Sequence, residues 1–132
     1  MNVEKDEMLH LAMADYKFWE EKLEKEPSQF PYLVKAAASQ SQLFNKTGKI
    51  ELLIEAEKKL IKANEATNYT KASYLKSLAH NYISQHRFKA SLALLKKAEA
   101  IGENLESTQK MLFDVYLELG SYKLAKSYLD KF

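Results

Sequence analysis

Near its C-terminal end the chain reads YLELGSYKLAKSYLDKF, residues 116–132, and a related stretch, NYISQHRFKASLALLKKA, occupies residues 81–98. Each stretch has apolar residues at steps of three and four on both sides of a short polar break, which is the pattern of two amphipathic helices joined by a turn. Aligned on their breaks, the stretches and the residues before them match at one constant offset. The offset joins seven pairs: Leu78 with Leu112, Ala79 with Phe113, Tyr82 with Tyr116, Phe88 with Tyr122, Ser91 with Ala125, Leu95 with Leu129, and Ala98 with Phe132. A constant offset across so many positions indicates an internal repeat.

A third copy of the pattern precedes these two. Its second helix has Ala56, Leu60 and Ala63 at the positions of Ser91, Leu95 and Ala98, with a constant spacing that is one residue longer. In its first helix Phe44 corresponds to Tyr82, and this spacing is longer again by three residues, which the turn around Gly48 accommodates. The repeat therefore extends over most of the chain.

The composition favours an all-α chain. Of the 132 residues, 46% are hydrophobic and 29% are charged, with three Gly and two Pro. Ala, Leu, Lys and Glu, which favour helices, are abundant, whereas the β-branched Val occurs only at positions 3, 34 and 115. Turn signals divide the chain into about seven helices; they lie at Pro27–Pro31, Gly48, 64–70, His86–Arg87, Gly102 and Gly120–Ser121.

The periodicity also predicts where these helices begin and which residues they bury. The first helix is expected over 6–26, stopped by Pro27 and Pro31, and the second from about Tyr32 to Lys46. Ser107 or Thr108 is expected to cap the sixth. The predicted core-facing positions are Met8, Ala12, Tyr16, Trp19, Leu23, Leu53, Ala56, Leu60, Ala63, Leu75, Leu78, Ala79, Tyr82, Leu92, Leu95, Ala98, Ile101, Leu112, Phe113, Tyr116, Leu119, Ala125 and Leu129.

The repeat resembles the tetratricopeptide repeat (TPR). YLELGSYKLAKSYLDKF carries the family's Tyr, Gly-x-Tyr, small and Leu positions as Tyr116, Gly120, Tyr122, Ala125 and Leu129. NYISQHRFKASLALLKKA carries the Tyr, aromatic, Leu and Ala positions, but it has His86 at the Gly site and Ser91 at the small site. The family's Trp is absent from all three hairpins. Two alternatives remain. One is a related family of helical-hairpin repeats that binds RNA, and the other is an irregular helical bundle.

The resemblance implies an all-α fold, a right-handed superhelical array of antiparallel helix hairpins. The hairpins would occupy residues 31–69, 70–105 and 106–132, and residues 1–30 would form an N-terminal helix equivalent to the second helix of a partial repeat. In such arrays each repeat buries its apolar face against its neighbours. The packing face of the final helix should meet another repeat or a capping helix, and the sequence supplies neither, so we expect either a segment cut from a longer array or a homodimer formed through the C-terminal helix.

The resemblance also implies a binding site, because TPR proteins bind extended peptides of partner proteins in a concave groove. The groove positions carried over to this sequence are Lys35, Gln42, Asn45, Ser73, Lys76, His80, Ile83, Lys110, Asp114 and Leu117. Lys76 and Lys110 lie one repeat apart, so they are expected to meet an acidic side chain or a C-terminal carboxylate of the partner. The family's chaperone-binding branch has Asn four residues after such a Lys, whereas this chain has His80 and Asp114.

The sequence shows no pattern typical of an enzyme. It has no Cys, which excludes disulfides, thiolate catalysis and Cys-rich zinc sites. His80 and His86 are six residues apart and would not share a helix face, so no metal site is expected. The three Gly are isolated, so no Gly-rich phosphate loop is present. We therefore expect a non-enzymatic protein with neither metal nor cofactor.

The charge pattern argues against nucleic acid and membrane partners. The net charge is only +2, and 19 of the 20 basic residues are Lys, whereas phosphate sites favour Arg. The lysine pairs Lys58–Lys59 and Lys96–Lys97, interleaved with Glu, are interpreted as a solvated outer face. No apolar run approaches the roughly 18 residues of a membrane span. The charge is nevertheless uneven, since residues 1–30 hold four Lys and eight acidic residues.

Two functions fit these observations. The first is a protein–protein interaction module that binds a peptide or helix of a partner, and the second is a structural spacer or assembly segment of a longer helical-repeat protein. RNA binding ranks third. The N-terminus does not resemble a signal peptide. The sequence does not determine the compartment of this soluble protein: the cytoplasm is the default, and the periplasm is the alternative if a signal lies upstream.

Overall fold

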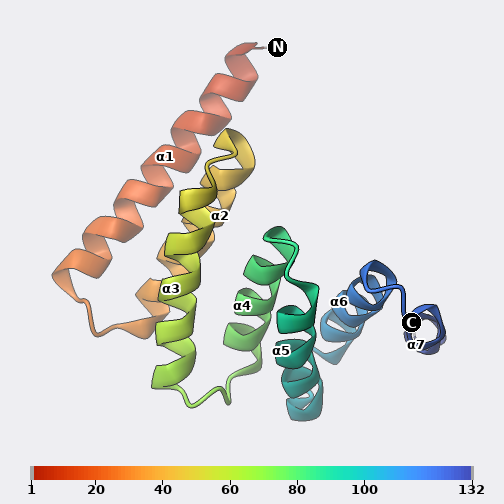
Figure 1. The fold of residues 1–132 in the computed structure, drawn as a ribbon. Helices are drawn as coiled ribbons and strands as arrows, with labels where there is room; N and C mark the ends of the chain where they lie inside the picture. Colours follow the sequence, from red (N-terminus) through yellow and green to blue (C-terminus); the bar gives the residue numbers. More distant parts are fainter. Residues whose placement is uncertain (1, 132) are drawn as a thin grey trace. The chain divides into compact units, whose positions relative to one another are not determined.

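The computed structural model describes residues 2–131, which form seven α-helices and no strand (Figure 1). The helices are α1 (Asn2–Lys25), α2 (Phe30–Thr47), α3 (Ile50–Ala66), α4 (Ala72–Ser84), α5 (Phe88–Ile101), α6 (Leu105–Glu118) and α7 (Tyr122–Leu129). The chain divides between Ala66 and Thr67 into two compact units. The predicted all-α fold of about seven helices is confirmed. The predicted hairpin boundaries and the assignment of residues 1–30 to a partial repeat stay predictions.

In unit 1, α2 packs against both α1 and α3. Small residues on α2 permit the close approach, since Ala36 and Ala37 are fully buried and Ser39 donates its hydroxyl hydrogen to the Ala36 carbonyl at 2.8 Å. From α3, Leu53 and Ala56 are fully buried, as the helical periodicity predicts. The core of unit 1 is therefore centred on α2.

The entry to α2 differs from the prediction. Pro31 was expected to lie outside the second helix, but α2 begins at Phe30 and Pro31 lies in its first turn. A proline is favoured there because its missing N–H would have no helical partner and its fixed φ suits the helix. At the other end, Gly48 adopts a φ of 70° and donates its N–H to the Phe44 carbonyl at 2.7 Å, which confirms the predicted turn.

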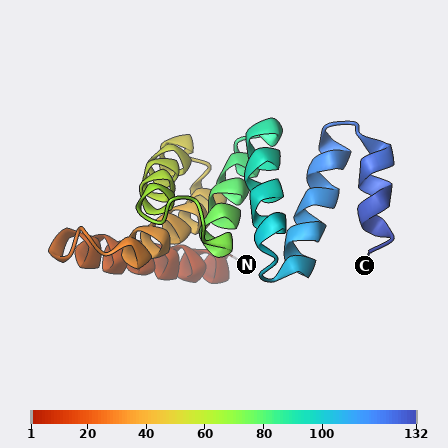
Figure 2. The same ribbon diagram turned by 90° about the horizontal axis from the view of Figure 1, so that it is seen from below.

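In unit 2, each helix packs against the next, from α4 to α7. Figure 2 shows α6 and α7 side by side. The short turn between them contains Gly120. Tyr82 and Tyr116 are buried, and so are the small residues Ser91 and Ala125. These four positions behave as the repeat predicts.

The two turns of unit 2 have the same hydrogen bonds at equivalent repeat positions. Arg87 donates its N–H to the Tyr82 carbonyl at 2.8 Å, and Ser121 donates its N–H to the Tyr116 carbonyl at 2.9 Å. The residue before each donor is left-handed, with a φ of 59° at His86 and 76° at Gly120. His86 therefore adopts the same left-handed conformation as Gly120 at the equivalent repeat position, although this conformation is strained for an L-residue.

Several predicted burial positions are wrong. Met8, Ile101 and Leu129 are exposed by 47%, 40% and 52%. Leu129 was matched to Leu95, which is fully buried, but the residue of α7 that is buried is Tyr128. Leu95 lies on a helix packed between α4 and α6, whereas α7 packs among the described residues against α6. The remaining repeat position, Phe132, lies outside the described residues.

The predicted cap of α6 is also wrong. The helix begins at Leu105 after Asn104, which has a φ of 46°. Ser107 and Thr108 lie in the first turn and donate their hydroxyl hydrogens to the Asn104 carbonyl, at 3.1 and 3.3 Å. A cap would instead accept a hydrogen bond from a backbone N–H.

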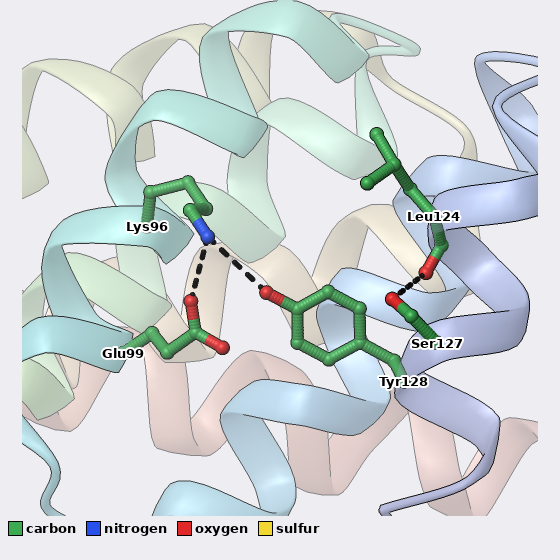
Figure 3. A network of polar contacts seen from close by, with 5 residues as sticks. All are labelled: Lys96, Glu99, Leu124, Ser127 and Tyr128. Atoms are coloured by element: carbon green, nitrogen blue, oxygen red, sulfur yellow. Dashed lines mark hydrogen bonds and ion pairs between the residues drawn. The ribbon is translucent and has the colours of Figure 1, made fainter.

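Tyr128 fastens the short helix α7 to the rest of unit 2 (Figure 3). Its ring stacks on Tyr116 with centroids 5.7 Å apart, and Lys131 lies 4.3 Å from its centroid. Its hydroxyl accepts a hydrogen bond from Lys96 Nζ at 3.2 Å, and the same Nζ lies 2.8 Å from Glu99 Oε1. An eight-residue helix is marginal by itself, so the contacts of Tyr128 with Tyr116 and Lys96 add to the packing of α7 on α6.

The same contacts displace the pKa values of the three groups. Two hydrogen bonds raise the pKa of Lys96: the larger effect comes from the bond to Glu99 and the smaller from the bond to Tyr128. Burial favours the neutral carboxyl of Glu99, but hydrogen bonds from Lys96 and Tyr128 outweigh it and lower the pKa. Burial and the hydrogen bond to Glu99 raise the pKa of Tyr128. The network therefore holds Lys96 and Glu99 in their charged forms and Tyr128 in its neutral form.

Replacing the glycine of the second repeat turn should destabilise the fold. A Cβ added at Gly120 would meet nothing within 4 Å, so the cost of Gly120→Ala comes from the left-handed backbone alone. We expect it to lower the free energy of unfolding by about 1 kcal/mol. His86→Gly removes strain but loosens the unfolded chain, so its effect should stay within about 0.5 kcal/mol. Urea denaturation measures both; a neutral Gly120→Ala would contradict the turn geometry.

Removing the Tyr128 hydroxyl should loosen α7. Tyr128→Phe keeps the stacked ring but loses the hydrogen bond from Lys96 and the one to Glu99, which should cost about 1 kcal/mol of unfolding free energy. Because the folded-state pKa of Glu99 is lowered, its contribution is complete above the ordinary pKa of 4.5 and is lost as the pH falls through the folded value. Denaturation at a series of pH values should show this acid loss reduced in Tyr128→Phe and absent in Glu99→Gln. An unchanged acid loss in Glu99→Gln would contradict the assignment.

Candidate functional site

A hollow of about 500 Å³ lies between α4 and α6 in unit 2. Its lining comes from α4, the following turn, the start of α5 and α6, and consists of His80, Ile83, His86, Phe88, Met111, Asp114, Val115, Leu117 and Glu118. We call this the α4/α6 hollow. It is open to solvent, and Leu117 is 41% exposed beside it.

Four of the ten predicted groove residues line the α4/α6 hollow: His80, Ile83, Asp114 and Leu117. They form two repeat-equivalent pairs, because His80 with Asp114 and Ile83 with Leu117 have the same offset as the aligned pairs of the repeat. Equivalent positions on the first helices of successive hairpins therefore meet at one site, which is the geometry that a helical repeat produces.

The α4/α6 hollow combines an apolar surface with polar groups. Ile83, Met111, Val115 and Leu117 contribute apolar side chains, and Asp114 and Glu118 contribute exposed carboxylates. The His86 ring lies edge-on to Phe88, with centroids 5.7 Å apart. Such a site can hold an apolar side chain while its rim forms hydrogen bonds.

The two predicted carboxylate-binding lysines do not line this hollow. Lys76 Nζ donates to Ser107 Oγ at 2.7 Å and to the Asn104 carbonyl at 3.5 Å, so it joins α4 to the beginning of α6. Lys110 Nζ pairs with Glu106 Oε1 at 3.4 Å. Ser73, a further predicted residue, is exposed on α4. The binding of a carboxylate by Lys76 and Lys110 stays a prediction.

In unit 1, Gln42 and Asn45 line a second hollow, of about 490 Å³, between α1 and α2. Its other lining residues are Met8, Leu11, Ala12, Asp15 and Lys46. Lys35 is exposed on α2 and is not among its lining residues. The hairpin-1 positions are thus divided between this hollow and open surface.

Sequence reasoning missed Met111, Val115, His86 and Phe88 among the residues that line the α4/α6 hollow. On α6, Met111 and Val115 lie three residues before and one residue after the predicted Asp114, which places them on the same side of the helix. That spacing could have identified Met111 and Val115 from the sequence. His86 and Phe88 could not be found this way, because they reach the site from a turn and the start of α5.

The interpretation of Lys59 as part of a solvated outer face is wrong. Lys59 Nζ donates to Gln40 Oε1 at 2.9 Å and lies 3.2 Å from Glu20 Oε1, and its side chain is only 16% exposed. These contacts join α3 to α2 and α1. Burial, followed by the charges of Glu20 and Glu55, raises the pKa of the neighbouring Tyr16. Tyr16 and Glu20, both on α1, thus belong to this polar contact.

Neither a metal-ion cluster nor a membrane-spanning helix is found in the described part of the chain. Within residues 2–131, no group of three or more His, Asp or Glu side chains is arranged to hold a metal ion. Among the helices of the same residues, none combines the length and the apolar character needed to cross a membrane.

Comparison with known proteins supports the fold. No protein-family model matches the chain, and no curated protein matches it. Among solved structures, MamA AMB-1, in the crystal form P212121, matches with a TM-score of 0.61 at 20% sequence identity, over 96% of this chain and 70% of that one. MamA is a TPR-like protein. The chain therefore has a TPR-like, all-α helical-repeat fold.

The contacts of Lys76 predict a structural role that can be measured. Lys76→Met keeps much of the apolar stem but leaves Ser107 and the Asn104 carbonyl without this donor, so it should lower the free energy of unfolding by about 0.5 kcal/mol. Lys110→Met removes only an exposed pair within one helix and should change it by less than about 0.3 kcal/mol. Equal effects in thermal or urea unfolding would contradict the special role of Lys76.

Proposed function

We propose that this chain is a TPR-family protein–protein interaction module, without enzymatic activity, that binds a peptide or helix of a partner protein in the α4/α6 hollow. The observation that carries the proposal is the meeting of two repeat-equivalent pairs, His80 with Asp114 and Ile83 with Leu117, at one open hollow. Repeat proteins use such surfaces, formed by successive repeats, to bind extended partners.

The size and chemistry of the hollow support a peptide as the ligand. About 500 Å³ accommodates one or two large side chains but leaves the site open to solvent. Ile83 and Leu117 offer apolar contacts, which contribute affinity, and His80 and Asp114 offer hydrogen bonds, which fix the register. A chain segment that continues past the hollow on both sides satisfies this open geometry.

The electrostatics support binding in preference to catalysis. Displaced pKa values mark candidate catalytic groups when they lie in a cleft. Here the displacements at Tyr16, Lys96, Glu99 and Tyr128 arise in contacts between packed helices, and these four residues line neither hollow. These displaced pKa values therefore belong to contacts that pack the helices together.

Peptide selection tests the proposal. A random-peptide phage library panned against the full chain should yield peptides whose affinity falls at least about tenfold for Leu117→Asp, because a charge would replace a central apolar contact. Leu117 is 41% exposed, so the variant should fold, which circular dichroism checks. Ile101→Asp is the matched control, since Ile101 is 40% exposed and does not line the hollow.

Two outcomes would contradict the proposal. The first is a library that yields no binder, and the second is a set of binders weakened equally by Leu117→Asp and Ile101→Asp. Either result would favour the alternative function, in which the chain is a structural spacer within a longer helical-repeat protein.

A further inference from the structure

Helix α1 has apolar side chains on two faces. The inner face packs on unit 1, where Ala12 joins Leu43 and Leu52 in a cluster flanked by Leu9, Met13 and Tyr16. On the outer face Met8, Leu11 and Phe18 are exposed by 47%, 71% and 49%. A helix that is apolar on two sides is suited to packing against two neighbours.

The outer face has the spacing of a helix–helix seam. Steps of four and three alternate through Glu4, Met8, Leu11, Asp15, Phe18, Lys22 and Lys25. We call these seven residues the outer seam. This alternation keeps side chains in register along a second helix, as in a coiled coil.

The charges of the outer seam are arranged to match an antiparallel copy of themselves. Glu4 lies at the beginning of α1, and Lys22 and Lys25 lie in its last turn. If two copies of α1 run in opposite directions, Glu4 lies opposite Lys22 of the second copy, and Met8 opposite its Phe18. Leu11 lies opposite Asp15. A two-fold axis makes every such contact twice.

We propose that the outer seam of α1 binds α1 of a second copy of this chain, antiparallel and about a two-fold axis. A parallel pair in register would place Glu4 on Glu4, Asp15 on Asp15 and Lys22 on Lys22, and like charges repel. A polar residue at a central seam position lowers affinity but selects one orientation. Asp15 therefore disfavours the in-register parallel pair.

The surroundings of the seam provide space for the second helix. Met8, Leu11 and Asp15 belong both to the outer seam and to the hollow between α1 and α2. Gln42, Asn45 and Lys46 form the α2 side of that hollow. Lys46 places a positive charge beside a helix that is itself acidic, since α1 holds seven acidic residues and four Lys. The acidic helix α1 of a second copy would therefore complement the positive charge of Lys46 in this hollow.

The same charges have a simpler effect within one chain. Glu4 in the first turn and Lys22 in the last turn favour the dipole of α1 itself. Exchanging both charges separates the two explanations. The exchange is most unfavourable for the dipole of a single helix, whereas it restores both ion pairs of an antiparallel pair.

Sedimentation equilibrium of the full chain over a range of concentrations tests the proposal. We expect a monomer–dimer equilibrium whose dissociation constant rises about tenfold for Glu4→Lys and for Lys22→Glu, because each reversal places like charges at two sites. The double exchange, Glu4→Lys with Lys22→Glu, should restore the wild-type constant to within about threefold. Leu11→Glu should abolish the dimer.

Matched controls lie on the same helix outside the seam. Glu24→Lys and Lys17→Glu make equivalent charge changes at exposed positions and should leave the dissociation constant unchanged. Circular dichroism confirms that each variant keeps its helix content. A third comparison, Leu124→Glu on α7, should also have no effect, whereas it would dissociate a dimer formed through the C-terminal helix.

Three results would overturn the proposal. One is a monomer at every concentration up to roughly 1 mM, the range in which even a weak specific pair associates. Another is a dimer that the double exchange weakens more than either single reversal. The last is a dimer that Leu124→Glu dissociates and Leu11→Glu does not.

Discussion

The hydrogen bond from a turn N–H to a tyrosine carbonyl, made by Arg87 to Tyr82 and by Ser121 to Tyr116, is the constraint on which unit 2 depends. It closes the turn, and the left-handed residue before each donor reverses the chain so that the next helix packs back on the previous one. Because the turn occurs twice with one geometry, α4 and α6 become equivalent helices. Equivalent residues such as His80 and Asp114 then line a common hollow.

The fold could be predicted from the sequence because the repeat is defined by residues that lie close together in the sequence. Tyr82, Ser91 and Ala98 are buried where the repeat predicts, and His86 adopts the same left-handed conformation as Gly120 at the equivalent position. Leu129 could not be placed by the same rule. Its burial depends on which helix covers its face, and its counterpart Leu95 lies on a helix packed between two neighbours.

The candidate site was predicted in part, for a related reason. Equivalent positions on α4 and α6, such as Ile83 and Leu117, follow from the repeat, and both line the α4/α6 hollow. The partners of long polar side chains do not follow from it. Lys76 on α4 reaches Ser107 on α6, and Lys59 on α3 reaches Glu20 on α1, because helices that are distant in sequence are apposed. A spacing rule cannot anticipate those contacts.

The central claim is that the α4/α6 hollow binds a partner peptide, and methyl NMR of the labelled full chain tests it most directly. On titration with a peptide selected from a random library, the methyl signals of Ile83, Met111 and Leu117 should shift progressively and saturate together. Those of the buried residues Leu53 and Leu60 in unit 1 should stay in place. Saturable shifts that appear elsewhere and leave the methyl signals of Ile83 and Leu117 unmoved would contradict the account.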